Sequence, residues 1–519
     1  MHQPESYYLR VGGAGELADE QDRRFYRFLE ILPGSLAWLT IFLMFFLSWL
    51  IPAFVAVFII LFDVYWLLKT VFLSFHLRGT FRKMRLNLKT DWMAKLGEVE
   101  KNGKPWRGVY HLVLLPMYNE SYDVVRETLD SLTRSRYPLD RLIVALATEE
   151  RAMEADAAVA EAAKKIEEEF KDKFFRFLTT RHPADIAGEL AGKGSNDAWA
   201  VKEAKRLVID PLGLDYEKII VSVFDVDTQI FPDYFGCLTF NFLTCEHPLR
   251  SSFQPIPFFT NNIYWAPALA RIISFSATFW QMMQQSRPER LTTFSSHAMA
   301  FAPLAEIGFW QTNVVSEDSR IFWQCFLHFD GDWRTVPLFY PVSMDANVAP
   351  SFWKTMVNQY KQQRRWGYGV ENIPYMLFGF SKNKKIPFRK KLYFGFNGLE
   401  GFHSWATNAL IVFSLGWLPL ILGGDAFKTT MLSYNLPQIT RFILLLATAG
   451  IASSAVLSVL LLPPKPEWFR WWHYALYILQ WVLTPFSLIA FGALPGLEAQ
   501  TRMMLGKYMG FWVTPKSRN

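Results

Sequence analysis

Apolar residues are concentrated toward the two ends of this chain. Near the N-terminus, residues 36–50 and 53–75 form two runs that carry almost no charge and are separated by Ile51-Pro52. At 1.5 Å per helical residue, each run approaches or spans a bilayer core of about 30 Å. The pattern predicts a transmembrane hairpin. Asp63 lies inside the second run, where a carboxylate either has a functional role or faces a neighbouring helix.

Three further apolar runs follow residue 400, at residues 403–422, 442–462 and 471–494. Three crossings would leave the C-terminal tail outside, but four basic residues favour the cytoplasm for that tail: Arg502, Lys507, Lys516 and Arg518. Either the last run, which Pro485 interrupts, is a short hairpin or re-entrant segment, or another run does not span. The number of crossings is left open.

The middle of the chain, residues 78–391, has the mixed charged and apolar character of a soluble domain. Short strand-like runs occur at residues 111–115 (HLVLL), 142–147 (LIVALA) and 219–224 (IIVSVF), with helical stretches at 123–135 and 151–170. Strands that alternate with helices predict an α/β fold with a parallel sheet, in which ligands bind outside the carboxyl ends of the strands. Polar residues that follow the strands are therefore the first candidates for a site.

These patterns divide the chain into six parts. They are an N-terminal cytoplasmic segment (1–33), a transmembrane hairpin (34–77), a cytoplasmic domain (78–384), an interfacial segment (385–402), C-terminal transmembrane helices (403–496) and a tail (497–519). The interfacial segment, together with residues 352–380, either lines the entrance of a channel or only anchors the domain.

Composition supports a membrane protein over a cytosolic enzyme. Of 519 residues, 51% are hydrophobic and only 19% are charged. The net charge is +7, and the basic residues cluster where apolar runs end, which is the positive-inside pattern and not a nucleic-acid-binding stripe. We therefore expect an inner or plasma membrane protein with its central domain in the cytoplasm and no nucleic-acid partner. Three separate cysteines, Cys237, Cys245 and Cys325, favour neither a disulfide framework nor a zinc site.

Two of the predicted strands end in aromatic and acidic residues. The first runs into Tyr118-Asn119-Glu120, which could pack on a base and hydrogen-bond a ribose, although Asn119 could simply cap the next helix. The second runs into Glu149-Glu150, which could accept hydrogen bonds from a nucleobase or could only stabilise the dipole of the following helix.

The third strand carries the sharpest signal, Asp225-Val226-Asp227. Two carboxylates directly after a buried strand are costly unless compensated, and a hard divalent cation that bridges a diphosphate would compensate them. Turn-capping aspartates are the alternative. Upstream, Gly192-Lys193-Gly194 offers a flexible turn with a charge for phosphate, or an ordinary loop.

Two later motifs add acid–base and phosphate-binding chemistry. Ser316-Glu317-Asp318 places an acid pair in an aromatic setting, where it could act as a general base or merely begin a helix. In the helical stretch from residue 352, one face offers Gln362, Arg365 and Trp366. Arg grips phosphate and Trp stacks on a sugar ring, although near a membrane the same residues could form an interfacial anchor.

The order and spacing of these six motifs resemble the family 2 membrane glycosyltransferases of the cellulose, chitin and hyaluronan synthase type, over residues 108–370. The resemblance implies an A-type glycosyltransferase fold, a Rossmann-like mixed sheet inserted between transmembrane helices. It implies a UDP- or GDP-sugar donor whose nucleoside is held by Tyr118, Glu120 and Glu149, with Lys193 nearby. It further implies that Asp225 and Asp227 position the diphosphate and Mg²⁺ or Mn²⁺, and that Asp318 is the general base of an inverting displacement. Glu317, Gln362, Arg365 and Trp366 would hold the pyrophosphate and the acceptor.

The resemblance predicts a hexosyltransferase that extends a growing polysaccharide, with export of the chain as a further expectation. A usual Thr-Glu-Asp is here Ser316-Glu317-Asp318, which keeps both acids. A usual Asp after the second strand is here Glu149 or Glu150, which leaves the nucleobase open. The alternatives are transfer of one sugar to a lipid-linked acceptor, and a catalytically silent, transporter-like relative, which the intact acidic motifs disfavour. Membrane lipids are expected partners in every case.

Overall fold

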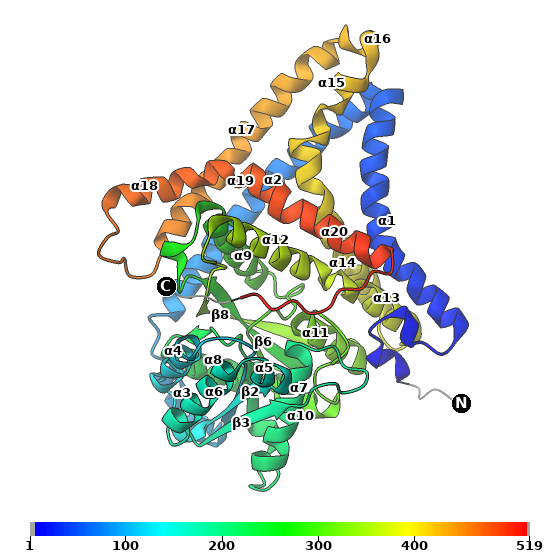
Figure 1. The fold of residues 1–519 in the computed structure, drawn as a ribbon. Coiled ribbons are helices and arrows are strands. Elements are labelled where there is room, and N and C mark those ends of the chain that lie inside the picture. Colours follow the sequence, from blue (N-terminus) through cyan, green and yellow to red (C-terminus); the bar gives the residue numbers. More distant parts are fainter. Residues whose placement is uncertain (1–5, 516–519) are drawn as a thin grey trace.

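The centre of the chain forms one mixed eight-stranded sheet, seen in the computed structural model in Figure 1, which describes residues 6–515. The strand order is β3-β2-β1-β4-β7-β6-β8-β5. The strands are β1 (Tyr110–Pro116), β2 (Leu142–Glu149), β3 (Arg176–His182), β4 (Ile219–Val223), β5 (Gln229–Ile230), β6 (Ser251–Phe259), β7 (His297–Ala300) and β8 (Arg334–Met344). Strands β3, β2, β1 and β4 run parallel, whereas β7 is antiparallel to both of its neighbours.

The central strands are apolar on both faces because each face supports a separate core. In β1, Leu112 and Leu114 face one hydrophobic cluster, and Val113 and Leu115 face the other. The helices of the domain are α3 (Trp92–Lys101), α4 (Tyr122–Thr133), α5 (Glu150–Ala155), α6 (Ala157–Phe170), α7 (Lys193–Ala204), α8 (Tyr234–Thr244), α9 (Ala268–Gln285), α10 (Phe301–Glu306) and α11 (Glu317–His328). Burial on both faces explains why β1, β2 and β4 are continuous apolar runs.

Long helices from both ends of the chain gather on one side of the sheet (Figure 1). They are α1 (Glu20–Leu50), α2 (Pro52–Asn87), α14 (Phe388–Phe413), α17 (Met431–Leu460) and the stretch Trp471–Met504, which ends in α20 (Leu494–Met504). Shorter helices connect them to one another and to the sheet: α12 (Phe352–Gly367), α13 (Asn372–Lys382), α15 (Leu418–Leu422), α16 (Gly424–Lys428), α18 (Trp471–Leu479) and α19 (Thr484–Leu488). An α/β sheet inserted between apolar helices, as the sequence predicts, is confirmed.

Four helices in the described part of the chain are long and apolar enough to cross a membrane. They are Glu20–Leu50, Pro52–Asn87, Met431–Leu460 and the stretch Trp471–Met504. A fifth candidate, Phe388–Phe413 followed by Leu415–Leu422, is bent by 49°. Four crossings would return the tail to the side on which the chain begins. The bent pair would not change this if it is re-entrant, because a re-entrant segment enters and leaves on the same side. Lys516 and Arg518 of the basic tail lie outside the described residues.

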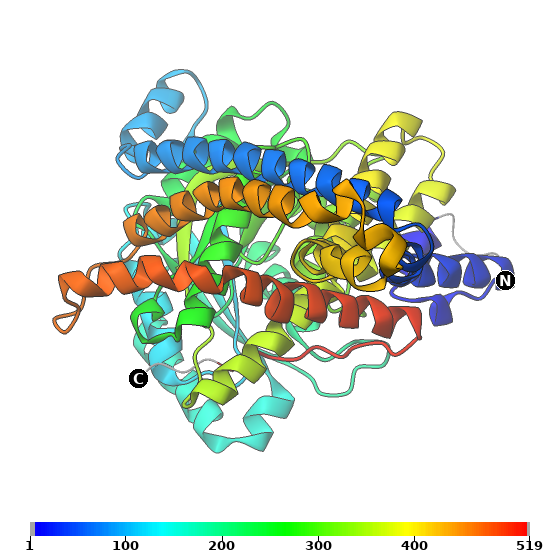
Figure 2. The ribbon, with the colours of Figure 1, turned by 90° about the horizontal axis from the view of Figure 1, so that it is seen from above.

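Asp63 lies at a helix–helix contact and not on the outer surface. Its side chain is buried on α2, and α2 packs along α17, which lies beside it in the view from above (Figure 2). Of the two alternatives for this carboxylate, the structure therefore shows the one in which it faces a neighbouring helix.

Candidate active site

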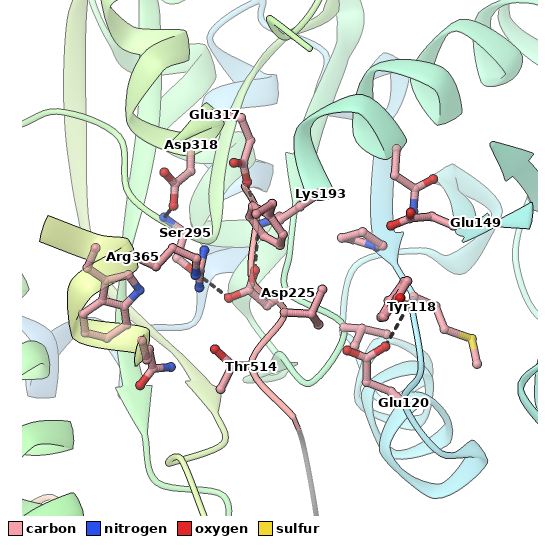
Figure 3. Close-up of a pocket in the computed structure, with 18 of the residues that line it drawn as sticks. Tyr118, Glu120, Glu149, Lys193, Asp225, Ser295, Glu317, Asp318, Arg365 and Thr514 are labelled. Atoms are coloured by element: carbon pink, nitrogen blue, oxygen red, sulfur yellow. Dashed lines mark hydrogen bonds and ion pairs between the residues drawn. The ribbon is translucent and has the colours of Figure 1, made fainter. Parts of the chain in front are cut away.

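One pocket lies where β1, β2 and β4 end, between the sheet and the long helices. It collects ten residues that the sequence singled out: Tyr118, Glu120, Glu149, Lys193, Asp225, Glu317, Asp318, Gln362, Arg365 and Trp366. Figure 3 shows their side chains converging from the strand ends, from the start of α7, from the start of α11 and from α12. The carboxyl-end rule for parallel sheets therefore locates this cluster correctly.

Asp227, unlike the ten residues above, does not line the pocket. Its side chain is fully buried, and its Oδ2 accepts a hydrogen bond of 2.8 Å from the backbone N–H of Asp345. Asp225, two residues earlier, points into the pocket (Figure 3). The two aspartates therefore face different surroundings. Among residues 6–515, no group of three or more His, Cys, Asp or Glu side chains is arranged to hold a metal ion.

Lys193 pairs with Asp225 at the base of the pocket. Its Nζ lies 2.6 Å from Asp225 Oδ1 and 4.0 Å from Glu317 Oε1. Burial alone would lower the pKa of Lys193, but the carboxylates around it outweigh this effect and raise its pKa above the ordinary value. Lys193 is therefore a fixed cation at the point where α7 begins.

In the acid pair at the start of α11, Asp318 is held by backbone donors. Asp318 accepts 2.8 Å from the N–H of Ser319 on Oδ1 and 3.0 Å from the N–H of Ser295 on Oδ2. Its neighbour Glu317 is almost fully buried, and burial together with the charge of Asp318 raises the pKa of Glu317 well above the usual value. The two acids thus have unlike environments, although both line the pocket.

Ser316 does not cap α11 with its side chain, although it stands at the N-cap position. Its hydroxyl donates 2.7 Å to Glu371 Oε1, which also accepts from the N–H groups of Val315 and Ser316. Burial raises the pKa of Glu371. The start of α11, which carries the acid pair, is therefore tied to the short helix Tyr368–Glu371 that follows α12.

Gln362, Arg365 and Trp366 lie on one face of α12, as the helical spacing predicts. The Trp366 ring contacts Phe259 and Phe294, with centroid distances of 5.9 and 5.7 Å. All three rings line the pocket, and an aromatic ring there could stack on a sugar ring.

The opposite end of the pocket is built from the loops after β1 and β2. Glu120 accepts hydrogen bonds from the N–H groups of Tyr118 (2.8 Å) and Asn119 (3.2 Å). Arg151 forms an ion pair with Glu149 and lies 4.7 Å from the Tyr118 ring centroid. Ser121, not Asn119, occupies the N-cap of α4, so the capping alternative for Asn119 is wrong.

Several lining residues carry no local sequence signal. Ser295 and Phe294 come from the loop before β7, and Phe511, Val513 and Thr514 come from the C-terminal segment, which crosses the pocket (Figures 1 and 3). The Arg365 guanidinium lies 4.8 Å from the Phe511 ring centroid. Only the fold brings these segments to the strand ends, so inspection of one stretch of sequence could not find them.

Asp197 could have been found from the sequence, because it lies four residues after the candidate Lys193 and therefore on the same face of a helix. It lies one helical turn after Lys193, is fully buried, and neither of its carboxylate oxygens has a hydrogen-bond partner. Burial raises the pKa of Asp197 to about 8, against the lowering effect of Lys193. It is a second acid behind the Lys193–Asp225 pair.

Comparison with known proteins gives only distant matches. No family model matches the chain, and no curated protein sequence matches it significantly. A mannosyltransferase from Pyrobaculum calidifontis, PcManGT, solved in complex with GDP-Man and Mn²⁺, is 14% identical with a TM-score of 0.39, over 84% of this chain and 100% of that one. TarS residues 1–349 from S. aureus is 12% identical with a TM-score of 0.36, over 67% of this chain and 90% of that one. Similarities this low do not assign the chain to a family.

Proposed function

We propose that this chain is a membrane-integrated inverting glycosyltransferase with an A-type fold, which transfers a sugar from a UDP- or GDP-sugar to a growing glycan. The observation that carries the proposal is the convergence on one pocket of Asp225, Asp318 and Arg365. These supply a donor-side carboxylate, a base and a phosphate-binding cation from three separate elements.

In the proposed reaction, Asp318 accepts the proton of an acceptor hydroxyl. The hydroxyl oxygen forms a bond to the anomeric carbon, and the bond between that carbon and the diphosphate oxygen breaks. The electron pair leaves with the nucleoside diphosphate, whose charge Lys193 and Arg365 stabilise. Attack from the face opposite the leaving group inverts the configuration.

The remaining pocket residues would orient the two substrates. Tyr118, Glu120 and Glu149 lie at the strand-end side, where a nucleoside would sit. Gln362 and Trp366 lie on α12, where an acceptor sugar would stack. A bound acceptor and donor would exclude water from the buried acid pair.

The charge balance of the pocket supports a divalent cation, Mg²⁺ or Mn²⁺. Five carboxylates line the pocket against the two cations Lys193 and Arg365. Arg151 compensates Glu149, and a raised pKa favours the protonated form of Glu317, yet the remaining carboxylates still outnumber the cations. An incoming diphosphate adds further negative charge. Carboxylate oxygens are the ligands that these hard ions prefer, and when bound the ion would neutralise the leaving diphosphate.

Asp225 would be the pocket-facing ligand for such an ion, whereas Asp227 does not line the pocket and could act on the ion only indirectly. Replacing Asp225 with Ala should abolish the Mn²⁺ dependence of nucleoside diphosphate binding, measured by calorimetry in detergent. Asp227→Ala should weaken it less, because Asp227 bonds to the Asp345 backbone and does not line the pocket. An identical metal titration in both variants and in the wild type would place the cation elsewhere.

We propose a polysaccharide as the acceptor. α12, which lines the pocket, packs on α20, the last part of a stretch that is apolar enough to cross a membrane. Tyr360 and Arg364 both donate to Glu498, at 2.8 and 2.6 Å, and Gly367 lies against Gly496. The helix that carries Arg365 and Trp366 is thereby fixed to the helices through which a product could leave. A lipid-linked acceptor that receives one sugar remains the second candidate, since a lipid would approach the same side.

The deciding experiment is turnover by the purified protein in lipid nanodiscs with a panel of UDP- and GDP-sugars and Mg²⁺ or Mn²⁺, followed by sizing of the product. A long polymer from one donor supports the polysaccharide reading, and a single sugar on a lipid supports the second candidate. If the folded protein shows no transfer and no donor hydrolysis with every member of the panel, the proposal is refuted.

A further inference from the structure

Ser295 contacts both carboxylates on which the proposed reaction depends. It lies in the loop between α9 and β7 and is almost fully buried. Its Oγ donates 2.9 Å to Asp225 Oδ2, and its backbone N–H donates 3.0 Å to Asp318 Oδ2. In Figure 3, Ser295 stands between these two side chains. A single residue therefore links the donor-side carboxylate to the base.

The backbone of Ser295 adopts a conformation that residues other than glycine rarely adopt. Its φ is +34°, in the left-handed region. Such a conformation persists only where the surrounding structure over-determines it, and such residues cluster at functional sites. A glycine would adopt this φ without a steric penalty. A serine at this position therefore has a conformational cost that glycine would not have, and the hydrogen bond from its hydroxyl to Asp225 can offset this cost.

The loop around Ser295 is held from both sides. Gln254 accepts from the N–H of Phe294 at 2.9 Å and donates to the carbonyl of Ser296 at 3.0 Å. The carbonyl of Ser295 lies 2.8 Å from His297 Nδ1. These bonds hold the backbone of the loop and therefore direct the Ser295 N–H at Asp318. From this backbone the hydroxyl reaches Asp225, with Met344 Sδ 3.8 Å away as its other acceptor.

We propose that Ser295 is a positioning residue that holds Asp225 and Asp318 in a fixed relationship, so that a donor bound beside Asp225 lies within reach of a hydroxyl activated by Asp318. The inference rests on the proposed function. In this inference, the Ser295 hydroxyl positions Asp225 on the donor side, and the Ser295 backbone N–H positions Asp318, the base. Transfer rates respond steeply to small misplacements of reacting groups, which gives such a link a measurable effect.

The variant Ser295→Gly separates this role from a merely structural one. It keeps the N–H bond to Asp318 and relieves the backbone, but it removes the hydroxyl bond to Asp225. We expect unchanged folding and a loss of kcat of about tenfold to a hundredfold, as for one hydrogen bond to a charged group, with a smaller change in KM for the acceptor. A structural role alone predicts that Ser295→Gly is at least as active as the wild type, and that result would overturn the proposal.

Ser295→Ala and Ser296→Ala complete the comparison. Ser295→Ala should lose activity like Ser295→Gly, because both lack the hydroxyl. Ser296 is a buried serine in the same loop whose hydroxyl lies 3.3 Å from Thr228 Oγ1 and does not contact either carboxylate, so Ser296→Ala should retain wild-type kinetics. Equal losses in Ser295→Ala and Ser296→Ala would assign the effect to loop stability and count against the inference.

A double-mutant cycle tests whether the hydroxyl acts through Asp225. The kcat of sugar transfer would be measured for the wild type, Ser295→Gly, Asp225→Asn and the double variant. We expect the effect of Ser295→Gly to shrink in the Asp225→Asn background, whereas simple additivity would overturn the link. If the wild type neither binds a nucleotide nor transfers a sugar, both the proposed function and this inference are refuted. An active wild type with an equally active Ser295→Gly refutes the role of Ser295 alone.

Discussion

A β-carbon added to Gly192 would lie only 2.6 Å from Cγ of Phe511, so the C-terminal segment is packed directly against the turn that begins α7. Gly192 immediately precedes Lys193, which pairs with Asp225. The segment that contributes Phe511, Val513 and Thr514 to the pocket is therefore seated on the same turn that places the buried cation.

Gly192→Ala should displace the C-terminal segment from the pocket. A contact of 2.6 Å to a ring atom cannot be tolerated without movement of one partner. We expect weaker UDP or GDP binding, by about tenfold if the segment contributes one well-packed aromatic contact. Gly510→Ala is the matched control, since a β-carbon there meets no atom within 4 Å. Gly192→Ala should add little to Phe511→Gly, because the ring and the Cβ atom that clash, at 2.6 and 2.7 Å, are then both absent; additive losses would contradict the explanation.

Asp318→Asn should reduce transfer by about 10²- to 10⁴-fold while nucleotide binding is retained, because a general base contributes on that scale. Both carboxylate oxygens accept backbone N–H bonds, so an Asn side chain keeps one of these bonds and loses the other. The unfolding temperature is therefore measured beside kcat. Glu306→Gln, at an exposed carboxylate, is the control. Full activity in a folded Asp318→Asn protein would reject this residue as the base.

Arg320→Met should destabilise the protein by about 3–5 kcal/mol, the cost of removing one partner from a buried charged network. Arg320 is fully buried and donates to Asn372 Oδ1, the Val11 carbonyl and the Glu371 carbonyl at 2.6, 3.2 and 3.0 Å. Its loss leaves several acceptors unpaired. Thermal unfolding in detergent measures the effect, and Arg334→Met, at an exposed ion pair with Glu246, should change little. Equal shifts in the two variants would mean that the buried network is not stabilising.

The sequence predicts the strands whose two faces are both buried. Residues 111–115, 142–147 and 219–224 correspond to β1, β2 and β4, because burial on both faces demands a continuous apolar run. β3 (Arg176–His182) escapes the same criterion because it is an edge strand with exposed polar residues. β6 and β8 escape it because each contains two prolines, which argue against a strand interior.

The same distinction applies to the candidate site. Residues in the turn that follows a predicted strand, such as Glu120 and Asp225, could be placed from the sequence because the strand fixes where the turn begins. Asp227 could not be placed, since whether a residue two positions later turns inward or toward the pocket depends on its bond to Asp345. Ser295 and Phe511 reach the pocket only through long-range packing, which no local pattern encodes.

His111 predicts a loss of stability at acidic pH. It is fully buried on β1, packed against the rings of Tyr137 and Phe235, with Nε2 2.8 Å from Thr239 Oγ1. Burial lowers the pKa of His111 from 6.5 to about 3. The unfolded chain therefore takes up a proton on this side chain below pH 6.5, whereas the folded chain remains neutral down to about pH 3.

The stability that neutral His111 contributes is fully present above pH 6.5 and is lost progressively as the pH falls toward 3, by about 1.4 kcal/mol for each pH unit. Unfolding temperatures of the wild type and of His111→Phe would be compared between pH 7.5 and 4.5 at one heating rate. The variant keeps an aromatic ring but has no titrating group, so its unfolding temperature should fall less with decreasing pH than that of the wild type. His247→Asn, at an exposed histidine, serves as the control. If the unfolding temperatures of the wild type and His111→Phe fall equally with pH, protonation of His111 is not what destabilises the fold in acid.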